Sequence, residues 1–513
     1  MWTKLKLYFH TLKYLKPIQI RYRLFYALRR KLNLYHLLSK QNFQLNPRNL
    51  AFRESITSFP WEVKENTFEF LNQSVTFDKD GINWNYSEFG KLWTYNLNYF
   101  EFLHQEKLTK EEGLRYIRNY IENGETLKDG LEPYPISLRI IFWIRFIAKH
   151  EIQDDQINNI LGKHLTRLFN HIEYHLLGNH LMENSFALIF GGLYFSNDII
   201  FEKGKVLLIQ ELKEQILDDG AHFEYSPMYH DILLYRLLDV YNLISQNTDD
   251  SVFNSILREK ISLMLSWSSL LSFTDQRRAF FNDTTQEIAP SFKDLQSYAK
   301  RLGIGLSENH KLGESGFRRY EKEGSIFIID CGPAGASYIP GHAHNDALSF
   351  ELHHKGDPMI VNTGISTYNN SERRRYERST LAHNTVQIGN MEQSETWSAF
   401  RLGRRSINKI LVDREDSFEG ESEHYSGAAH KRCFRFGDNE ILIKDQISGG
   451  AGKAAFHFHP SYPLERVKNI ISFSNSHSVE IEEFEYSLGY NKFATGYRYL
   501  VDFEGVLETT IKI

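Results

Sequence analysis

The hydrophobic and polar positions of this chain follow two different patterns, one in each half. From about residue 82 to 303, apolar residues recur every three or four positions and proline is scarce, which is the pattern of amphipathic helices. The clearest helical segments are 111–123, 137–148, 157–176, 231–245 and 255–272. Two short stretches, 178–180 and 219–220, carry the Gly, Asn and Asp residues of loops. This half is therefore predicted to consist of stacked helix pairs.

Beyond about residue 313 the pattern changes to short runs that alternate or that are rich in β-branched and aromatic residues, as strands are. Strands are expected at 325–330, 348–353, 359–362, 384–388, 431–436, 440–447, 455–459, 479–486 and 507–513. Frequent Gly, Asn and Asp turns without intervening helices favour an antiparallel β-sandwich. The chain is thus of the α+β multidomain class, with the change from helix to strand near 305–320. We divide it into 1–50, 51–312 and 313–513.

The first 50 residues differ from the rest in charge. They contain eleven Lys and Arg residues and no Asp or Glu, interleaved with Leu, Tyr and Phe. This composition predicts a basic amphipathic N-terminal arm of helical character. Two interpretations stay open: the arm makes a peripheral contact with an anionic membrane surface or an acidic glycan, or it is a solvated helix packed by its apolar stripe.

Overall composition excludes some classes of protein. A net charge of −5 argues against nucleic acid as a partner. No run of 18 apolar residues exists to span a membrane. Lys13, Lys16, Arg21 and Arg23 interrupt every apolar stretch that could serve as the core of a signal peptide. The expected location is therefore cytoplasmic or associated with the inner membrane. Aromatic residues make up 14% of the chain, enough for a core and for stacking on sugar rings.

Polar residues that can do chemistry gather at the start of the β half. His342 and His344 alternate in the run Gly-His-Ala-His-Asn-Asp at 341–346, so both can face one cleft or share a metal ion. Asn362 and His383 end or open neighbouring strands. The alternative is that these imidazoles only hydrogen-bond within a sheet edge. His-x-His-x-Asp also occurs in metallo-β-lactamase-like hydrolases, although Ala347 follows the Asp here and a long helical region precedes it.

Two polar clusters interrupt the apolar helical half. One spans 178–184 and includes Asn179 and His180; the other spans 219–230 and includes Glu224, Tyr229 and His230. Burying so many hydrogen-bonding groups is costly unless they line a wet cleft or satisfy one another. For each cluster taken alone, helix capping is an equally good explanation.

Taken together, these motifs resemble the heparinase II/III family of polysaccharide lyases, which are related to the oligoalginate lyases. The resemblance rests on Asn179-His180, on the string from Glu224 to His230, and on the series from Gly341 through Asn362 to 378–386. It extends to 92–97 and 133–139, which are similar to segments of relatives encoded with surface-polysaccharide genes. The family implies an incomplete (α/α) toroid over 51–312, followed by the antiparallel β-sandwich, with a uronic-acid glycan bound between them.

The resemblance also implies roles for single residues. The catalytic positions correspond to Asn179, His180, Tyr229 and His342, and the substrate-binding positions to Glu224, His230, Arg378, Tyr134 and Arg139. His344 and His383 match metal ligands of the family, whereas Asn362 stands where the family usually has Asp. A neutral amide oxygen is a poorer ligand for a divalent cation. A structural Zn²⁺ or Ca²⁺ is therefore only weakly indicated, and the chemistry is expected to need no cofactor.

The chemistry implied is β-elimination beside a uronic acid of an acidic polysaccharide, in surface-polysaccharide metabolism. Asn179 and an imidazole would neutralise the carboxylate so that the C5 proton can leave. Tyr229 would be the base or the acid, with His180 as base in the second case. Two alternatives stay open: a glycoside hydrolase, which needs two carboxylates such as Glu183 and Glu224, and a glycan-binding protein without turnover.

Overall fold

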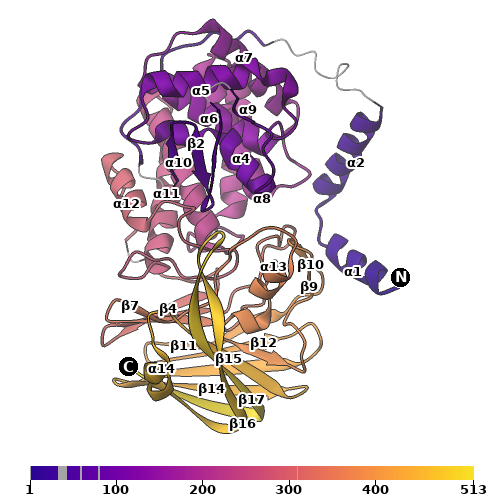
Figure 1. Ribbon diagram of the computed structural model, residues 1–513, viewed down its shortest axis with the longest axis vertical. Coiled ribbons are helices and arrows are strands. Elements are labelled where there is room, and N and C mark those ends of the chain that lie inside the picture. The colour runs from indigo at the N-terminus through magenta and orange to yellow at the C-terminus, as the bar shows by residue number, and fades with distance from the viewer. Residues whose placement is uncertain (1, 33–42, 58–60, 79–80, 309) are drawn as a thin grey trace.

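The computed structural model describes residues 2–32, 43–57, 61–78, 81–308 and 310–513. Helices fill one half of the molecule and a large curled sheet fills the other (Figure 1). The N-terminal arm lies along the side of both halves. The predicted α+β class, helical first and antiparallel β second, is confirmed. Residues 1 and 33–42 of the predicted arm lie outside the described residues.

The helical half is built from α4 to α12, two short 3-10 helices and a small meander of strands. The helices are α4 (Lys91–Tyr99), α5 (Lys110–Glu122), α6 (Pro133–Lys149), α7 (Asp155–Phe169), α8 (Gly178–Tyr194), α9 (Asp198–Gln215), α10 (Pro227–Asn247), α11 (Ser251–Leu270) and α12 (Phe292–Arg301). The 3-10 helices are Glu101–His104 and Gly124–Thr126. The strands, which the sequence pattern did not predict, are β1 (Val63–Lys64), β2 (Thr67–Phe70) and β3 (Gln73–Thr76).

Two local predictions in this half are wrong. The helix expected at 157–176 ends at Phe169, and the residues expected to form a loop at 178–180 are the first turn of α8. The reason is backbone geometry: Leu177 and Gly178 adopt positive φ angles of 66° and 59°, which turn the chain sharply into α8. The non-helical segment 170–177 therefore precedes the site, and Asn179 and His180 lie on a helix.

The central helix α8 is almost wholly buried. Its neighbour α9 approaches so closely that a Cβ at Gly192 would lie 2.4 Å from the backbone nitrogen of Phe201. Glycine is required there because any side chain would push the two helices apart. The helix α10 is buried along most of its length and begins with Pro227 at its first position, where a missing N–H costs nothing. Both helices are thus rigid supports for whatever their first turns carry.

The β half is one antiparallel sheet of 12 strands. Its path runs β11-β12-β13-β14-β17-β15-β7-β6-β5-β4, with β16 paired to β17 and β8 to β15, and β9 and β10 form a separate hairpin. The strands are β4 (Phe317–Lys322), β5 (Ser325–Asp330), β6 (Phe350–His354), β7 (Asp357–Ile360), β8 (Val386–Ile388), β9 (Thr396–Trp397), β10 (Arg401–Leu402), β11 (Ile407–Arg414), β12 (Ser417–Glu423), β13 (Ala429–Phe436), β14 (Glu440–Ser448), β15 (Gly452–Phe458), β16 (Ile471–Gly489) and β17 (Lys492–Lys512). Short helices α13 (Glu372–Glu377), η3 (Thr380–Ala382) and α14 (Leu464–Ile470) interrupt it.

The loop between α11 and α12 joins the two halves. The backbone N–H of Asn282 donates to the Asp346 carboxylate at 2.8 Å, and its side-chain oxygen accepts from the N–H of His344 at 3.0 Å. On the other side, the Asn282 amide donates to the carbonyl of Tyr225 at 3.1 Å. This loop therefore fixes the start of α10 against the 341–346 run of the β half.

The arm consists of α1 (Trp2–Leu12) and α2 (Pro17–Lys31). Side chains on one face of α2 donate to carbonyl oxygens of the segment 170–177: Gln19 to Leu176 at 3.1 Å, Arg23 to His175 at 3.2 Å and Tyr26 to Ile172 at 2.7 Å. The indole N–H of Trp397 donates to Thr11 of α1 at 3.1 Å. The arm thus contacts both halves. Among the described residues, no helix is long and apolar enough to cross a membrane.

Candidate active site

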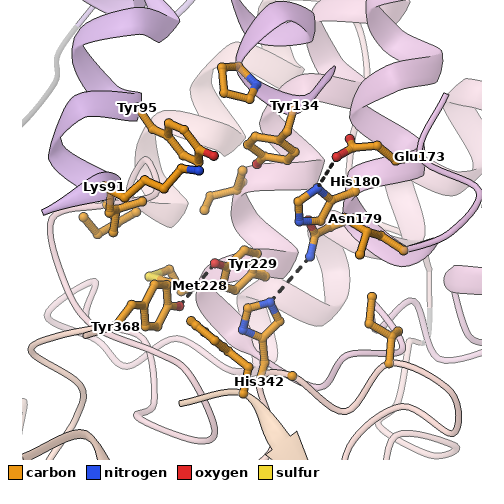
Figure 2. A pocket seen from close by; sticks show the side chains of 18 of the residues that line it. Lys91, Tyr95, Tyr134, Glu173, Asn179, His180, Met228, Tyr229, His342 and Tyr368 are labelled. Atoms are coloured by element: carbon orange, nitrogen blue, oxygen red, sulfur yellow. Dashed lines mark hydrogen bonds and ion pairs between the residues drawn. The ribbon is translucent and has the colours of Figure 1, made fainter. Parts of the chain in front are cut away.

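A cavity of about 890 Å³ lies where the helical half, the sheet and the arm meet. Asn179, His180, Tyr229, His342 and Tyr134 all line it, and Figure 2 shows them converging on one space. The structure therefore brings the four residues expected to be catalytic together, from α8, α10 and the β half. Several tyrosines line the wall as well, namely Tyr95, Tyr99, Tyr368 and Tyr490, which are surfaces on which sugar rings stack.

Asn179 and His180 lie in the first turn of α8. The backbone N–H of Asn179 donates to the Glu224 carboxylate at 3.0 Å and its side-chain amide donates at 3.1 Å. Glu224 thus fixes the orientation of Asn179. The first turn of a helix has free N–H groups and the positive end of the helix dipole, so an anion is stabilised there.

His180 is held by a carboxylate. Its Nδ1 lies 3.2 Å from an oxygen of Glu173, whose other oxygen accepts from the Asn184 amide at 3.0 Å. Burial alone would lower the pKa of His180, but the Glu173 carboxylate raises it above its usual value. The bond through Nδ1 leaves Nε2 as the nitrogen available to a ligand, as a general base requires.

Tyr229 is the third residue of α10. The hydroxyl of Ser226, the N-cap residue of α10, accepts a hydrogen bond from the backbone N–H of Tyr229 at 3.2 Å. Its own hydroxyl accepts from the hydroxyl of Tyr368 at 3.2 Å (Figure 2). Burial raises the pKa of Tyr229 above its usual value, with the nearby Asp283 and Glu224 carboxylates adding to the effect. The phenol therefore stays protonated at neutral pH and keeps its own hydrogen free to donate.

His342 stands between two carboxylates beside Tyr229. Its Nδ1 lies 2.8 Å from Asp283 and its Nε2 lies 3.2 Å from Glu224. The ring also packs against Tyr229, with centroids 3.9 Å apart. The amide nitrogen of Asn179 is 3.5 Å from Nε2, so Asn179 and His342 present neighbouring polar atoms to the cavity.

Asp283 is the residue that connects this site to the rest of the β half. Its fully buried carboxylate binds His342, His344 at 2.8 Å and the guanidinium of Arg374 at 2.8 Å. Burial would raise the pKa of Asp283, but Arg374 and the imidazoles hold it well below its usual value. The carboxylate is therefore ionised, and it fixes which nitrogen of each imidazole carries a proton.

Four predicted substrate-binding residues do not line the cavity, which corrects the sequence-based expectation. Glu224 is 1% exposed, and its carboxylate binds Asn179 and His342. His230 is fully buried and bonded to the backbone of His222 and Met264. Arg139 is fully buried and bonded to Asn98, Tyr120 and Gly130. Each is used to satisfy other buried groups, because a buried donor or acceptor without a partner is costly.

The fourth is Arg378, which donates to the carbonyl oxygens of Ala343 at 3.0 Å, Ser398 at 3.0 Å and Arg401 at 3.3 Å. It therefore braces the backbone that carries His342 and β10. Its neighbour Arg374 is the arginine that reaches Asp283, at 2.8 Å. Tyr134 remains the one residue of the predicted binding set that lines the cavity, and its ring lies 4.7 Å from that of His180.

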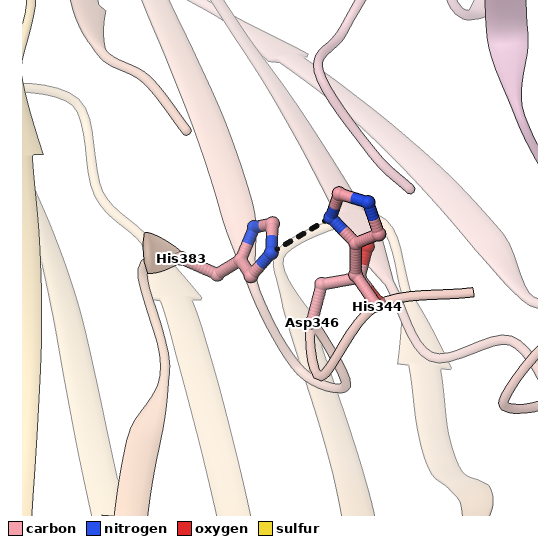
Figure 3. A group of neighbouring side chains, drawn as sticks. All are labelled: His344, Asp346 and His383. Atoms are coloured by element: carbon pink, nitrogen blue, oxygen red, sulfur yellow. Dashed lines mark hydrogen bonds between the residues drawn. The ribbon is translucent and has the colours of Figure 1, made fainter. Parts of the chain in front are cut away.

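A second cluster lies behind His342. His344, Asp346 and His383 place one ligand atom each within 4.8 Å of one another (Figure 3). Nδ1 of His344 and Nε2 of His383 are 3.2 Å apart. Asp346, in the same 341–346 run as the two alternating histidines, is the carboxylate of this cluster. The oxygen of Asn362 accepts from Ser349 at 2.8 Å and from the N–H of Asn384 at 3.2 Å, and its role as a ligand stays a prediction.

Sequence reasoning missed three residues of the site. Asp283 lies in a polar run that directly follows the apolar residues 279–281. This change from apolar to polar residues is visible in the sequence, but no motif spacing marks Asp283 as a site residue. Glu173 lies within a segment that was assigned to a helix. Tyr368 carries no motif at all. All three act on other residues of the site, and such pairings depend on the fold.

Comparison with known protein families fits this geometry. Residues 135–302 match the family model described as "Heparinase II/III N-terminus", and residues 305–497 match "Heparinase II/III-like, C-terminal". The chain belongs to the heparinase II/III family. The break between the two matched ranges falls between α12 and β4, where the helical half ends and the sheet begins.

Curated relatives of this heparinase II/III family member are named heparin-sulfate lyases. The one from Bacteroides stercoris is 23% identical over 326 residues, covering 58% of this chain and 47% of the relative. The one from Pedobacter heparinus is 22% identical over 312 residues, covering 55% and 46%. The chain therefore spans about half the length of the curated relatives it matches.

Solved structures show the same fold. A crystal structure of heparinase III superposes with a TM-score of 0.69 at 15% identity, covering 97% of this chain and 92% of that one. The heparan sulfate lyase HepC from Pedobacter heparinus gives 0.56 at 17% identity, covering 87% and 81%. The toroid followed by a β-sandwich is thereby confirmed, and the metallo-β-lactamase-like alternative is wrong.

The pKa of His180 gives a direct test of the Glu173 contact. We expect its pKa, measured by NMR titration of the imidazole, to lie above the usual value of a histidine side chain. The Glu173→Gln variant should lower that pKa, because the amide cannot stabilise the imidazolium and burial then dominates. Glu122→Gln, on the exposed end of α5, removes a charge elsewhere and should leave the value unchanged. An equal pKa in both variants would contradict the pairing.

Proposed function

We propose that this chain cleaves a uronic-acid-containing polysaccharide by β-elimination. The observation that carries the proposal is the pairing of two different proton-transfer groups in one cavity. His180 is tuned by Glu173 and presents Nε2, whereas Tyr229 is neutral and keeps a hydrogen to donate. The family and the names of its curated relatives support the same reaction class.

The carboxylate of the uronic acid must be stabilised before the C5 proton can leave. Asn179 and His342 line the cavity side by side at the N-terminus of α8. Hydrogen-bond donors fixed in a site that excludes water stabilise developing negative charge far better than they do in solution. We assign to these two residues the binding of the substrate carboxylate.

We assign the proton transfers from the position and protonation state of His180 and Tyr229 in the cavity. His180 Nε2 takes the proton from C5, and the electrons of that bond form the C4–C5 double bond. The bond from C4 to the glycosidic oxygen breaks, and Tyr229 protonates the departing oxygen. The tyrosinate left behind regains a proton from the imidazolium through solvent. We prefer this assignment to the reverse one because the phenol of Tyr229 carries its proton at neutral pH, whereas it would have to lose that proton before it could act as a base.

The hydrolase alternative has less support. It needs two carboxylates on opposite sides of the scissile bond. Neither Glu183 nor Glu224 is among the residues that line the cavity. Glu183 is fully buried beside Arg236, and Glu224 serves Asn179 and His342. Several other carboxylates do line the cavity. His180 and Asn184 use both oxygens of Glu173, and Glu101 and Glu132 form ion pairs with Arg236 and Lys91.

The Tyr229→Phe variant tests catalysis. Against a panel of uronic-acid glycans, the protein should release unsaturated products that absorb ultraviolet light. Removing the acid should lower kcat by about 10²–10⁴-fold, whereas Tyr241→Phe, farther along α10, should retain the parent rate. Absence of an unsaturated product across the panel would refute the lyase. Glycan binding without any turnover would instead identify a binding protein.

We also propose that the cluster of His344, Asp346 and His383 holds a structural divalent cation, with Zn²⁺ the best match. Two imidazole nitrogens and a carboxylate oxygen are a ligand set that zinc takes. The Nε2 of His344 is bound to the Asp283 carboxylate, so the lone pair of its Nδ1 faces the cluster. Metal-binding histidines are commonly oriented by a carboxylate on their other ring nitrogen in this way. Such an ion would tie the 341–346 run to the segment after η3.

Metal analysis of the purified protein tests this site. We expect about one zinc ion per chain by elemental mass spectrometry, and a lower Tm after chelation. His383→Ala and Asp346→Asn should both lose the ion, whereas His477→Ala, on the exposed side of β16, should keep it. Zinc that survives in both cluster variants would show that it binds elsewhere.

For the arm, we propose a peripheral contact with an anionic membrane surface, in keeping with a role in surface-polysaccharide production. Its inner face binds the two halves of the protein, but its outer face exposes large apolar side chains, among them Phe9 at 65% and Leu24 at 67%. The segment 1–50 has eleven cations and no acidic residue. An amphipathic helix of this composition binds through apolar insertion and attraction to anionic lipid.

Sedimentation with lipid vesicles tests the contact. The protein should pellet with phosphatidylglycerol vesicles and much less with phosphatidylcholine vesicles, and salt should weaken the binding. The double variant Phe9→Ser with Leu24→Ser should stay in the supernatant. Val252→Ser, which removes an exposed apolar side chain from α11, should bind like the parent. Equal binding by all three proteins would refute the role of the arm, and an oligomer on gel filtration would show that a second copy covers it.

A further inference from the structure

Three arginine side chains gather where the arm and the β9–β10 hairpin form the cavity wall. Arg23 of α2, Arg401 of β10 and Arg405, three residues after β10, all line the cavity. Arg404 lies between the last two and forms an ion pair with Glu395 at 2.9 Å. In the part of the chain that the structure describes, none of the three lining arginines has a carboxylate partner of this kind. The wall therefore carries positive charge that the protein does not neutralise.

The protein holds these guanidinium groups in place through neutral contacts. Arg23 donates to the carbonyl of His175 at 3.2 Å. Arg405 donates to the carbonyl of Ala336 at 3.2 Å and lies over the ring of Tyr14 of the arm at 4.0 Å. Arg378 braces the carbonyl of Arg401. The Nε of Arg405 is buried and has no hydrogen-bond partner among the described residues, so the protein does not use all the donors of this guanidinium.

Two of the three charges, those of Arg23 and Arg401, act on each other. Burial and the neighbouring Arg401 lower the pKa of Arg23, and burial lowers the pKa of Arg405 to about 10. Carboxylates near this wall are already used, because Glu214 binds Lys16 and Tyr338 and Glu173 binds His180. Holding like charges together is unfavourable, and an anionic ligand with several acceptor oxygens would remove that cost.

We propose that Arg23, Arg401 and Arg405 form a second anion subsite, which binds the acidic group of a sugar unit next to the one that is cleaved. The proposal rests on the lyase function above and narrows its substrate class to glycans with acidic groups on neighbouring units. A carboxylate and a sulfate ester both offer the oxygens that guanidinium groups bind in pairs. The arm lies outside both residue ranges that match the family models, so α2 adds this subsite to the family fold.

Calorimetric binding in a Tyr229→Phe background tests the subsite without turnover. The probes are three tetrasaccharides: oligomannuronate, with a carboxylate on every unit; chondroitin 4-sulfate, with a sulfate on the unit beside each uronate; and hyaluronan, with uncharged units between uronates. We expect at least one of the first two to bind more tightly than hyaluronan. Arg23→Ala and Arg405→Ala should each weaken that preferred probe about 10-fold or more and change hyaluronan binding little.

Arg21→Ala is the matched control, because it removes the same charge from the outward face of α2. It should bind all probes like the background protein. A loss confined to chondroitin 4-sulfate identifies sulfate as the second group, and a loss confined to oligomannuronate identifies a carboxylate. Unchanged binding in both arginine variants, equal losses for all three probes, or no binding of any probe would each overturn the subsite. If the parent protein, with Tyr229 intact, forms no unsaturated product, a selective loss of binding would retain the subsite and refute the lyase.

Discussion

The buried carboxylate of Asp283 is the contact on which the rest of the site depends. It forms hydrogen bonds with His342 of the cavity, with His344 of the second cluster and with both terminal nitrogens of Arg374. A buried charge is tolerated only when its partners are complete, and removing one partner typically costs about 3–5 kcal/mol. Asp283 belongs to the helical half by sequence, whereas its partners belong to the β half. Neither half can therefore form the site alone.

The side chains to which we assign the proton transfers come from two buried helix starts. The sharp turn at Leu177 and Gly178 sets Asn179 and His180 on the first turn of α8, and Ser226 caps the turn that carries Tyr229. Because α8 and α10 are packed in the core of the helical half, their first turns hold these groups rigidly. The arm then covers the segment before α8 by bonding its carbonyl oxygens. The position of the arm and the geometry of the site are thus linked.

The sequence was enough to predict the fold class and much of the site. It could not predict which side chains from distant segments contact one another. Periodicity separated helices from strands, and the family resemblance implied the site residues Asn179, His180, Tyr229 and His342, which line one cavity. The same motifs could not tell that Arg139, His230 and Arg378 point into the protein, because burial depends on packing rather than on spacing. The sequence also did not single out Asp346 as a member of the second cluster, because only the fold brings its carboxylate close to His383.

The reaction class is the central claim, and the masses of the products test it most directly. The enzyme is incubated with a defined uronic-acid oligosaccharide, and the two products of a single cleavage are weighed by mass spectrometry. Elimination predicts that the two masses sum to that of the substrate, with the uronic-acid end of one product lighter by one water than its saturated counterpart. A sum that exceeds the substrate by one water would show hydrolysis and contradict the assignment of His180 and Tyr229.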